Sequence, residues 1–135
     1  MNVALIDAGP MIVLFDKQSV AHAHYSEELS QGWLLTTTWA CIVEASHFLN
    51  PLNTQRFLNW IANGAVTVYP FDASHLSDMA KLMQTYTEWP RTEMDLADAT
   101  LVWLAAETQT NRIMTMDVRD FSRYRLPDGR RFEIL

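Results

Sequence analysis

Acidic side chains in four separate segments are the residues of this 135-residue chain best suited to chemistry. Asp7 and Asp117 each follow a short apolar run, Glu44 lies within a helical pattern, and Asp95 and Asp98 stand three residues apart. The i, i+3 spacing puts the last two on one face of a helix. Two carboxylates about 6 Å apart repel by on the order of 3 kcal/mol at an effective dielectric of about 20. If the fold gathers these acids, it therefore needs protonated carboxyls or bound divalent cations.

The bound cation is the sharper of these two hypotheses. A pocket of carboxylate oxygens without Cys or a well-placed His selects hard ions such as Mg²⁺ or Mn²⁺. His22 and His24 point to opposite sides of a helix, so they cannot chelate one ion. The lone Cys41 is expected in the core, and the four glycines form no phosphate-binding loop.

Local structure offers an alternative explanation for each acid. Asp95 suits the N-cap of a helix, with Asp98 then at its N3 position near the positive end of the dipole. Glu44 can be a solvated helix residue. The other acids can belong to turns: Asp7 before Gly9 and Pro10, Asp117 after its strand, and Asp120 in a loop fastened by Arg119.

The elements that must position these acids alternate along the chain. Short apolar runs predict strands at residues 3–6, 33–37, 65–69, 112–115 and 132–135. Helical patterns separate them at residues 10–15, 19–29, 38–49 and 72–86, from Asn53 or Thr54 onward, and at 95–107, which is apolar nearly all round. Alternation of this kind predicts a parallel sheet covered on both faces, with the carboxyl ends of its strands at one edge. Asp7, Asp117 and Thr37 should meet at that edge, where ligands bind in such sheets.

Length and composition predict one domain over residues 1–135, with 49% apolar residues to form its core. A single cysteine favours a reducing cytoplasm, and neither a membrane span nor a signal peptide is expected. A net charge of −6 argues against coating nucleic acid through bulk positive charge. Six of the ten basic residues nevertheless lie near the end of the chain: Arg112, Arg119, Arg123, Arg125, Arg130 and Arg131.

Two other parallel-sheet classes are excluded by their missing residues. A phosphorelay receiver needs a Lys near its last strand, and the only lysines are Lys17 and Lys81. A haloacid-dehalogenase-type phosphatase needs a second Asp two residues after the first, where this chain has Gly9.

Four segments in order, with the right gaps, resemble the PIN-domain ribonucleases and in particular the VapC-like toxins of toxin-antitoxin pairs. The segments are residues 5–10, Val43 with Glu44, residues 94–99 and residues 113–121. The resemblance spans nearly the whole chain. It implies a three-layer α/β/α PIN-like fold with a central, mainly parallel sheet.

The resemblance also implies roles for individual residues. Asp7, Glu44, Asp98 and Asp117 would form an acidic quartet that holds Mg²⁺ or Mn²⁺, with Asp95 as an additional acid. Thr115 would place a hydroxyl beside the fourth acid, and Asp120 would lie outside the direct ligands. The arginines that follow the fourth acid, Arg119, Arg123 and Arg125 among them, then form a basic rim for RNA phosphates, or else are solvated tail charges.

The function implied is metal-assisted hydrolysis of RNA phosphodiesters, with no protein nucleophile and with 5′-phosphate and 3′-hydroxyl products. A toxin of this kind has a cognate antitoxin and forms a homodimer; Trp39, Trp60 and Trp89 are the candidates for apolar surface. Ala8 stands where many members have Ser or Thr. It leaves open the alternative of a catalytically silent PIN-like protein that acts only as a binding partner.

Overall fold

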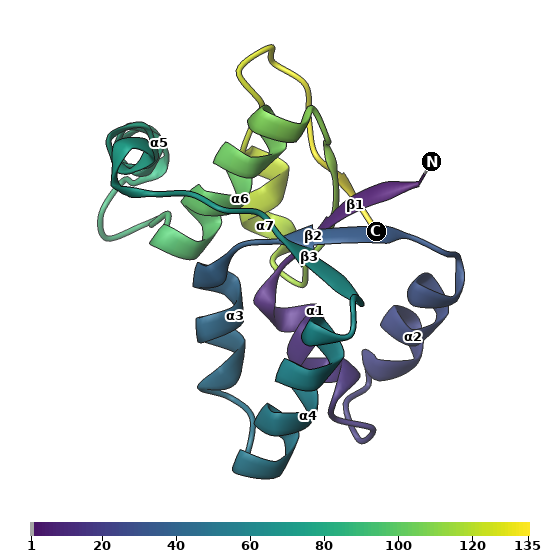
Figure 1. Cartoon of the computed structure of the whole chain (residues 1–135). Helices are drawn as coiled ribbons and strands as arrows, with labels where there is room; N and C mark the ends of the chain where they lie inside the picture. Colours follow the sequence, from purple (N-terminus) through teal and green to yellow (C-terminus); the bar gives the residue numbers. More distant parts are fainter. Residues whose placement is uncertain (1) are drawn as a thin grey trace.

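A five-stranded, entirely parallel sheet forms the centre of the molecule (Figure 1). The computed structural model describes residues 2–135. The strand order is β3-β2-β1-β4-β5, so β1 is central and pairs with β2 and β4. The strands are β1 (Val3–Ile6), β2 (Leu34–Thr37), β3 (Val66–Val68), β4 (Arg112–Met114) and β5 (Glu133–Ile134).

Helices cover both faces of this sheet. In Figure 1, α1 to α4 lie on one side of the sheet, and α6 and α7 lie on the other. Their bounds are α1 (Ala8–Leu14), α2 (His22–Ser30), α3 (Trp39–Ser46), α4 (Pro51–Ala62), α5 (Leu76–Tyr86), α6 (Leu96–Thr108) and α7 (Val118–Arg123), with a 3₁₀ turn η1 (Ala73–His75) before α5. The three-layer α/β/α fold expected from the sequence is confirmed.

The most apolar helix lies deepest in the core. Residues 97–105 of α6 are all buried, as its all-round apolar pattern predicted. Its neighbours include α3 and α5. Asp98 is the one ionisable side chain in that buried stretch, at 7% exposure. No helix in the described residues combines the length and the apolar character needed to cross a bilayer.

Three local predictions differ from the structure. α4 begins at Pro51 and not at Asn53 or Thr54, because the Asn50 side chain accepts a 2.8 Å hydrogen bond from the Asn53 N–H and proline fits the first helical position. The helix expected over residues 72–86 starts as η1, with Asp72 as its cap. The loop considered for residues 117–120 is instead the Asp117 cap and the first turn of α7.

Candidate metal centre

Three of the predicted acids are helix N-caps at the carboxyl edge of the sheet. Asp7 follows β1 directly and accepts a hydrogen bond from the Ala8 N–H at the start of α1 (2.7 Å). Asp95 caps α6 by accepting from the Asp98 N–H (2.8 Å), and Asp117 caps α7 by accepting from the Asp120 N–H (3.4 Å). The local explanation of Asp95 as an N-cap is confirmed. Capping and clustering are compatible, since each cap bond engages one carboxylate oxygen.

One pocket of about 360 Å³ collects the acids of all four segments. Among the described residues, its lining contains no Lys, Arg or His. The pocket is lined by Asp7, Ala8, Gly9, Glu44, Asp95, Asp98, Met116 and Asp117. All five residues expected as metal ligands therefore lie around one space. Gly9 permits the close approach of Met116, because a Cβ at this position would be 3.3 Å from the Met116 side chain.

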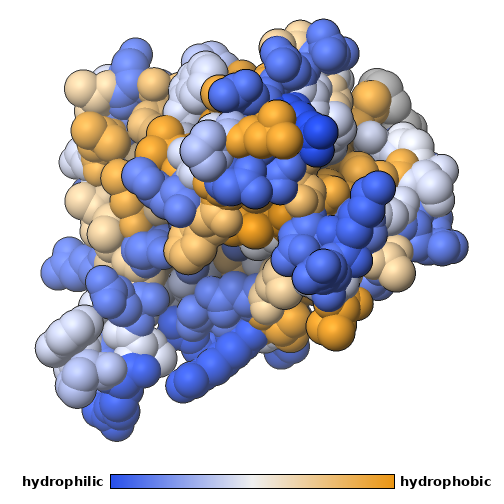
Figure 2. All heavy atoms as spheres, turned by 90° about the horizontal axis from the view of Figure 1, so that it is seen from below, coloured by the Kyte–Doolittle hydropathy of each residue, from blue (hydrophilic) through white to orange (hydrophobic). Residues whose placement is uncertain are grey.

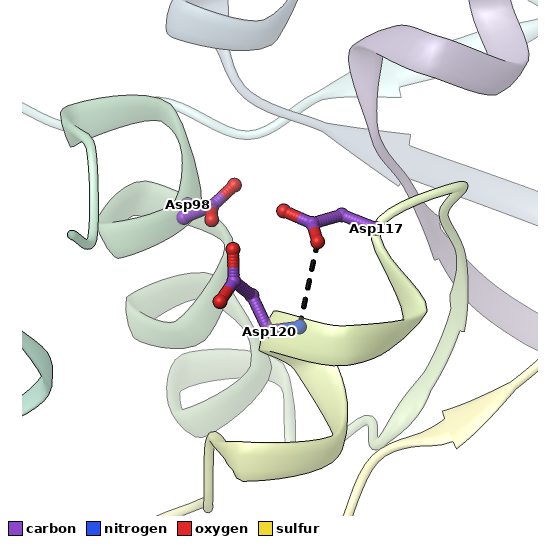
Figure 3. Close-up of side chains that lie close together, drawn as sticks. All are labelled: Asp98, Asp117 and Asp120. Atoms are coloured by element: carbon purple, nitrogen blue, oxygen red, sulfur yellow. Dashed lines mark hydrogen bonds between the residues drawn. The ribbon is translucent and has the colours of Figure 1, made fainter. Parts of the chain in front are cut away.

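A tighter group within this region joins α6 to α7. Carboxylate oxygens of Asp98, Asp117 and Asp120 lie within 4.8 Å of one another. Figure 3 shows the three side chains pointing toward a common space, with the Asp117 to Asp120 hydrogen bond between them. The structure thus places Asp120 beside two of the expected ligands.

The expected loop fastened by Arg119 is wrong. Residues 118–123 continue helically from the Asp117 cap, so Asp120 comes within reach of Arg123, three residues further on. The Arg123 Nη2 donates to Asp120 Oδ1 at 3.1 Å, whereas Arg119 is exposed. Asp120 is therefore the one member of the tighter group with a cationic partner.

Thr115 links the first acid to the fourth. The residue is 1% exposed, and its hydroxyl donates to Asp7 Oδ2 (2.8 Å) and accepts from the Asp117 N–H (3.1 Å). The Tyr25 hydroxyl donates to the Thr115 carbonyl oxygen (3.0 Å) from the side of α2. Asp7, itself 8% exposed, is held in place by donors on both of its oxygens.

Tyr124 supports Asp98, a role that the sequence did not lead us to expect. Its hydroxyl donates to Asp98 Oδ2 at 2.8 Å, and its ring is fully buried against those of Tyr86 and Phe121. No local signal indicates this bond, because it joins residues 26 positions apart and depends on how Tyr124, the C-cap residue of α7, packs beside α6.

Burial and mutual repulsion both favour the neutral form of the acids in this pocket. Burial raises the pKa of Asp98 to about 8, and the charges of Asp95 and Asp7 add to the effect. Burial also raises the pKa of Asp117 to about 6, with Asp120 contributing. The pKa values of Asp7 and Glu44 are raised as well, again mainly by burial and then by neighbouring acids. A hard divalent cation would supply the missing positive charge, so the donor set fits Mg²⁺ or Mn²⁺.

The remaining predicted residues lie outside the pocket lining. Arg123 packs over the Tyr124 ring at 5.6 Å, and the Arg125 Nη1 donates to the carbonyl oxygens of Ser122 and Tyr124. Of the three tryptophans considered as apolar surface, Trp39 and Trp89 are 56% and 75% exposed. Trp60 is half-buried against Phe15 and Phe57.

Cys41 is a core residue, as expected. It is fully buried, and its Sγ lies 4.0 Å from Asp7 Oδ1. Burial and the charge of Asp7 raise the pKa of its thiol, so the thiol stays protonated and does not act as a nucleophile.

Comparison with known proteins rests on structure, since no protein-family model and no curated sequence matches this chain. VapC20 of Mycobacterium tuberculosis, a toxin that cleaves the sarcin-ricin loop, superposes with a TM-score of 0.71 at 12% identity over 88% of this chain and 92% of that one. VapBC2 of Rickettsia felis, solved on a DNA fragment from its promoter, gives 0.65 at 13% identity over 98% of both chains. The chain therefore has the fold of the VapC-like PIN domains.

Proposed function

We propose that this protein is a metal-dependent endoribonuclease and the toxin of a toxin-antitoxin pair. One observation carries the proposal: acids from four segments line a single pocket at the carboxyl edge of a VapC-like sheet, and the lining of that pocket contains no Lys, Arg or His. Sites with hard oxygen donors of this kind serve hydrolysis of phosphodiesters.

The chain's own residues would hold Mg²⁺ or Mn²⁺ through Asp7, Glu44, Asp98 and Asp117, with Asp95 beside them. When bound, such a cation lowers the pKa of water and offsets negative charge at the phosphorus and the leaving oxygen. Thr115 and Tyr124 keep Asp7 and Asp98 in fixed orientations through their hydrogen bonds. Fixed orientation matters because ligands held by hydrogen bonds bind the metal more tightly.

Hydrolysis by water agrees with the side chains around the pocket. Cys41 is buried with a raised thiol pKa, and the lining described above offers no Ser, Thr, Lys or His as an alternative nucleophile. RNA cut in this way would carry 5′-phosphate and 3′-hydroxyl ends.

The partners follow from the same proposal. VapC20 is a toxin that cleaves the sarcin-ricin loop, and VapBC2 is a complex bound to promoter DNA. By analogy this chain would bind RNA, pair with a cognate antitoxin, form a homodimer and act in the cytoplasm. Apolar surface for an antitoxin segment is available at Phe48, Leu52 and Leu58, which are 47–71% exposed. These residues belong to α4 and the turn before it. Figure 2 views the molecule from below Figure 1, the side on which α4 lies, and shows hydrophobic patches between hydrophilic ones.

Incubation of the purified protein with RNA and Mg²⁺ or Mn²⁺ tests the proposal. We expect cleavage that EDTA abolishes. Asp7→Asn and Asp98→Asn should each abolish it while circular dichroism shows an intact fold. Asp78→Asn is the matched control, because Asp78 is exposed on α5 and does not line this pocket. Full activity in both pocket variants would remove the proposal.

The alternative is a catalytically silent PIN-like protein that only binds a partner. Ala8, which lines the pocket, is the observation that favours it, since a hydroxyl beside Asp7 is missing. Thr115 already supplies a hydroxyl to Asp7 from the end of β4, which makes the nuclease the better-supported function. A silent protein would show no EDTA-sensitive cutting at any Mg²⁺ or Mn²⁺ concentration.

A further inference from the structure

An open apolar groove lies beside the acidic pocket. Its volume is about 580 Å³, and its walls come from α3, the segment before η1 and the start of α6. Trp39 and Val43 of α3 are 56% and 53% exposed, and Leu96 of α6 is 45% exposed. Phe71 also lines the groove and is half-buried against the Trp103 ring. Large apolar side chains exposed together in this way mark a binding surface.

The groove and the acidic pocket are continuous. Glu44 and Asp95 line both of them. Trp39 begins α3, the helix that also carries Glu44, and Leu96 follows Asp95 directly in sequence. An extended substrate with a phosphate over the pocket can therefore place a neighbouring unit over the groove.

We propose that this groove binds one unstacked nucleobase of the RNA, next to the phosphate that is cut, with the Trp39 indole as its stacking surface. The inference rests on the proposed ribonuclease function and names the part of the substrate that this neighbouring surface recognises. It assigns the groove a single-stranded substrate, because a paired base cannot leave its stack to enter it without cost.

The apolar walls of the groove suit a base better than the charged RNA backbone. Of the three polar residues in its lining, Glu44 and Asp95 are the proposed cation ligands, so a phosphate binds at the cation, and His47 is exposed. A nucleobase is uncharged and presents a π-face that an aromatic side chain can bind whatever the base. The backbone is thus kept over the cation site, while the base lies over Trp39.

Binding of a short oligoribonucleotide in Ca²⁺ tests the inference separately from cleavage. We expect Trp39→Ala to weaken binding about tenfold, the decrease expected for one base–aromatic stack, and Trp39→Phe to weaken it less. Trp89→Ala is the matched control, because Trp89 is 75% exposed but does not line the groove. The same oligonucleotide is then prepared as a set in which each member lacks one base. One member should bind wild type and Trp39→Ala equally, because it lacks the base that stacks on Trp39.

Each outcome decides a different point. Equal binding of wild type and Trp39→Ala to the intact oligonucleotide, with Trp39→Ala folded by circular dichroism, overturns the subsite. The subsite is also wrong if Trp39→Ala lowers the affinity for every abasic oligonucleotide by the same factor. If sedimentation shows that Trp39→Ala converts a dimer to monomer while RNA binding is unchanged, the groove is a self-contact and the subsite is wrong. Base-dependent binding without EDTA-sensitive cleavage in Mn²⁺ would overturn the nuclease and keep the subsite.

Discussion

The Tyr124 hydroxyl donates a 2.8 Å hydrogen bond to Asp98 Oδ2 from the buried side of the acidic pocket. Tyr124 is fully buried and Asp98 is 7% exposed, so water does not compete strongly for this bond. Burial and the charge of Asp98 raise the pKa of Tyr124, which keeps its hydroxyl protonated as a donor. The bond ties α7 to α6 and leaves Asp98 Oδ1 for a ligand in the pocket.

Tyr124→Phe should therefore weaken Mn²⁺ binding about tenfold, within the range found when a hydrogen bond to a metal ligand is removed. Isothermal titration with Mn²⁺ measures the change. Tyr86→Phe is the control: its ring packs on Tyr124, but its hydroxyl accepts from the Arg125 N–H and touches no acid. Unchanged Mn²⁺ affinity in Tyr124→Phe would show that Asp98 does not depend on this bond.

Thr115 supports Asp7 through a hydrogen bond, as Tyr124 supports Asp98. Thr115→Val removes the donor to Asp7 Oδ2 and the acceptor for the Asp117 N–H while keeping the shape of the side chain. We expect the free energy of unfolding to fall by about 1–3 kcal/mol and Mn²⁺ affinity to fall with it. Urea denaturation followed by fluorescence gives the first quantity. Thr115→Ser keeps the hydroxyl and should recover most of the stability; a Val variant as stable as wild type would contradict the assigned role.

Much of the fold could be predicted because the strands are short apolar runs between breakers. A buried parallel strand has both faces covered, which makes residues such as Val3–Ile6 recognisable without alternation. Helix boundaries were harder to predict from the sequence. Pro51 is equally compatible with the end of one helix and the first turn of the next, and only the Asn50 cap decides between them.

The acidic pocket was predictable to the extent that sheet topology alone assembles it. Asp7 and Asp117 follow neighbouring strands, β1 and β4, so a parallel sheet must bring them together. The place of Asp120 and the support from Tyr124 depend on α7, which is too short to show a helical pattern. Its formation follows from the Asp117 cap and from burial of Phe121, a tertiary effect that local sequence does not contain.

The raised pKa values predict how stability depends on pH without metal. A carboxyl whose folded pKa is above its unfolded value near 3.8 stabilises the fold while protonated, and this contribution is lost as pH rises through the folded pKa. The decrease begins above pH 3.8 for both groups and levels off near pH 6 for Asp117 and near pH 8 for Asp98. In EDTA, the free energy of unfolding should therefore fall between pH 5 and pH 8, by on the order of 2–4 kcal/mol.

Urea unfolding at both pH values provides the measurement, with Asp98→Asn as the comparison. The variant has no carboxyl at this position, so its stability should change less with pH. Saturating Mn²⁺ should restore stability to the wild type at pH 8, by about 2.7 kcal/mol at a hundredfold excess over its dissociation constant. Equal pH dependence in the two proteins would show that Asp98 does not titrate as described.

The C-terminal arginines differ in how far they are already engaged, and this predicts which contributes to RNA binding. Arg123 is paired with Asp120 and Arg125 donates to two carbonyl oxygens, whereas Arg119 is exposed at the start of α7. Removal of one cation that binds a phosphate of single-stranded RNA lowers the slope of log K against log salt by about 0.7. We expect that decrease for Arg119→Ala and a smaller one per residue for the Arg123→Ala, Arg125→Ala double variant.

A potassium chloride titration of RNA affinity measures these slopes, and Arg91→Ala serves as the control because Arg91 is exposed but pairs with Glu88 in the loop before α6. Stability must be followed in the double variant, since removal of Arg123 leaves Asp120 without its cationic partner beside Asp98 and Asp117. Added Mn²⁺ should offset that destabilisation, because the cation compensates the same carboxylates. If the salt slopes of both variants stay at the wild-type value, these arginines do not bind RNA phosphates. They are then solvated charges, with Arg123 serving only its ion pair with Asp120, and the predicted basic rim is wrong.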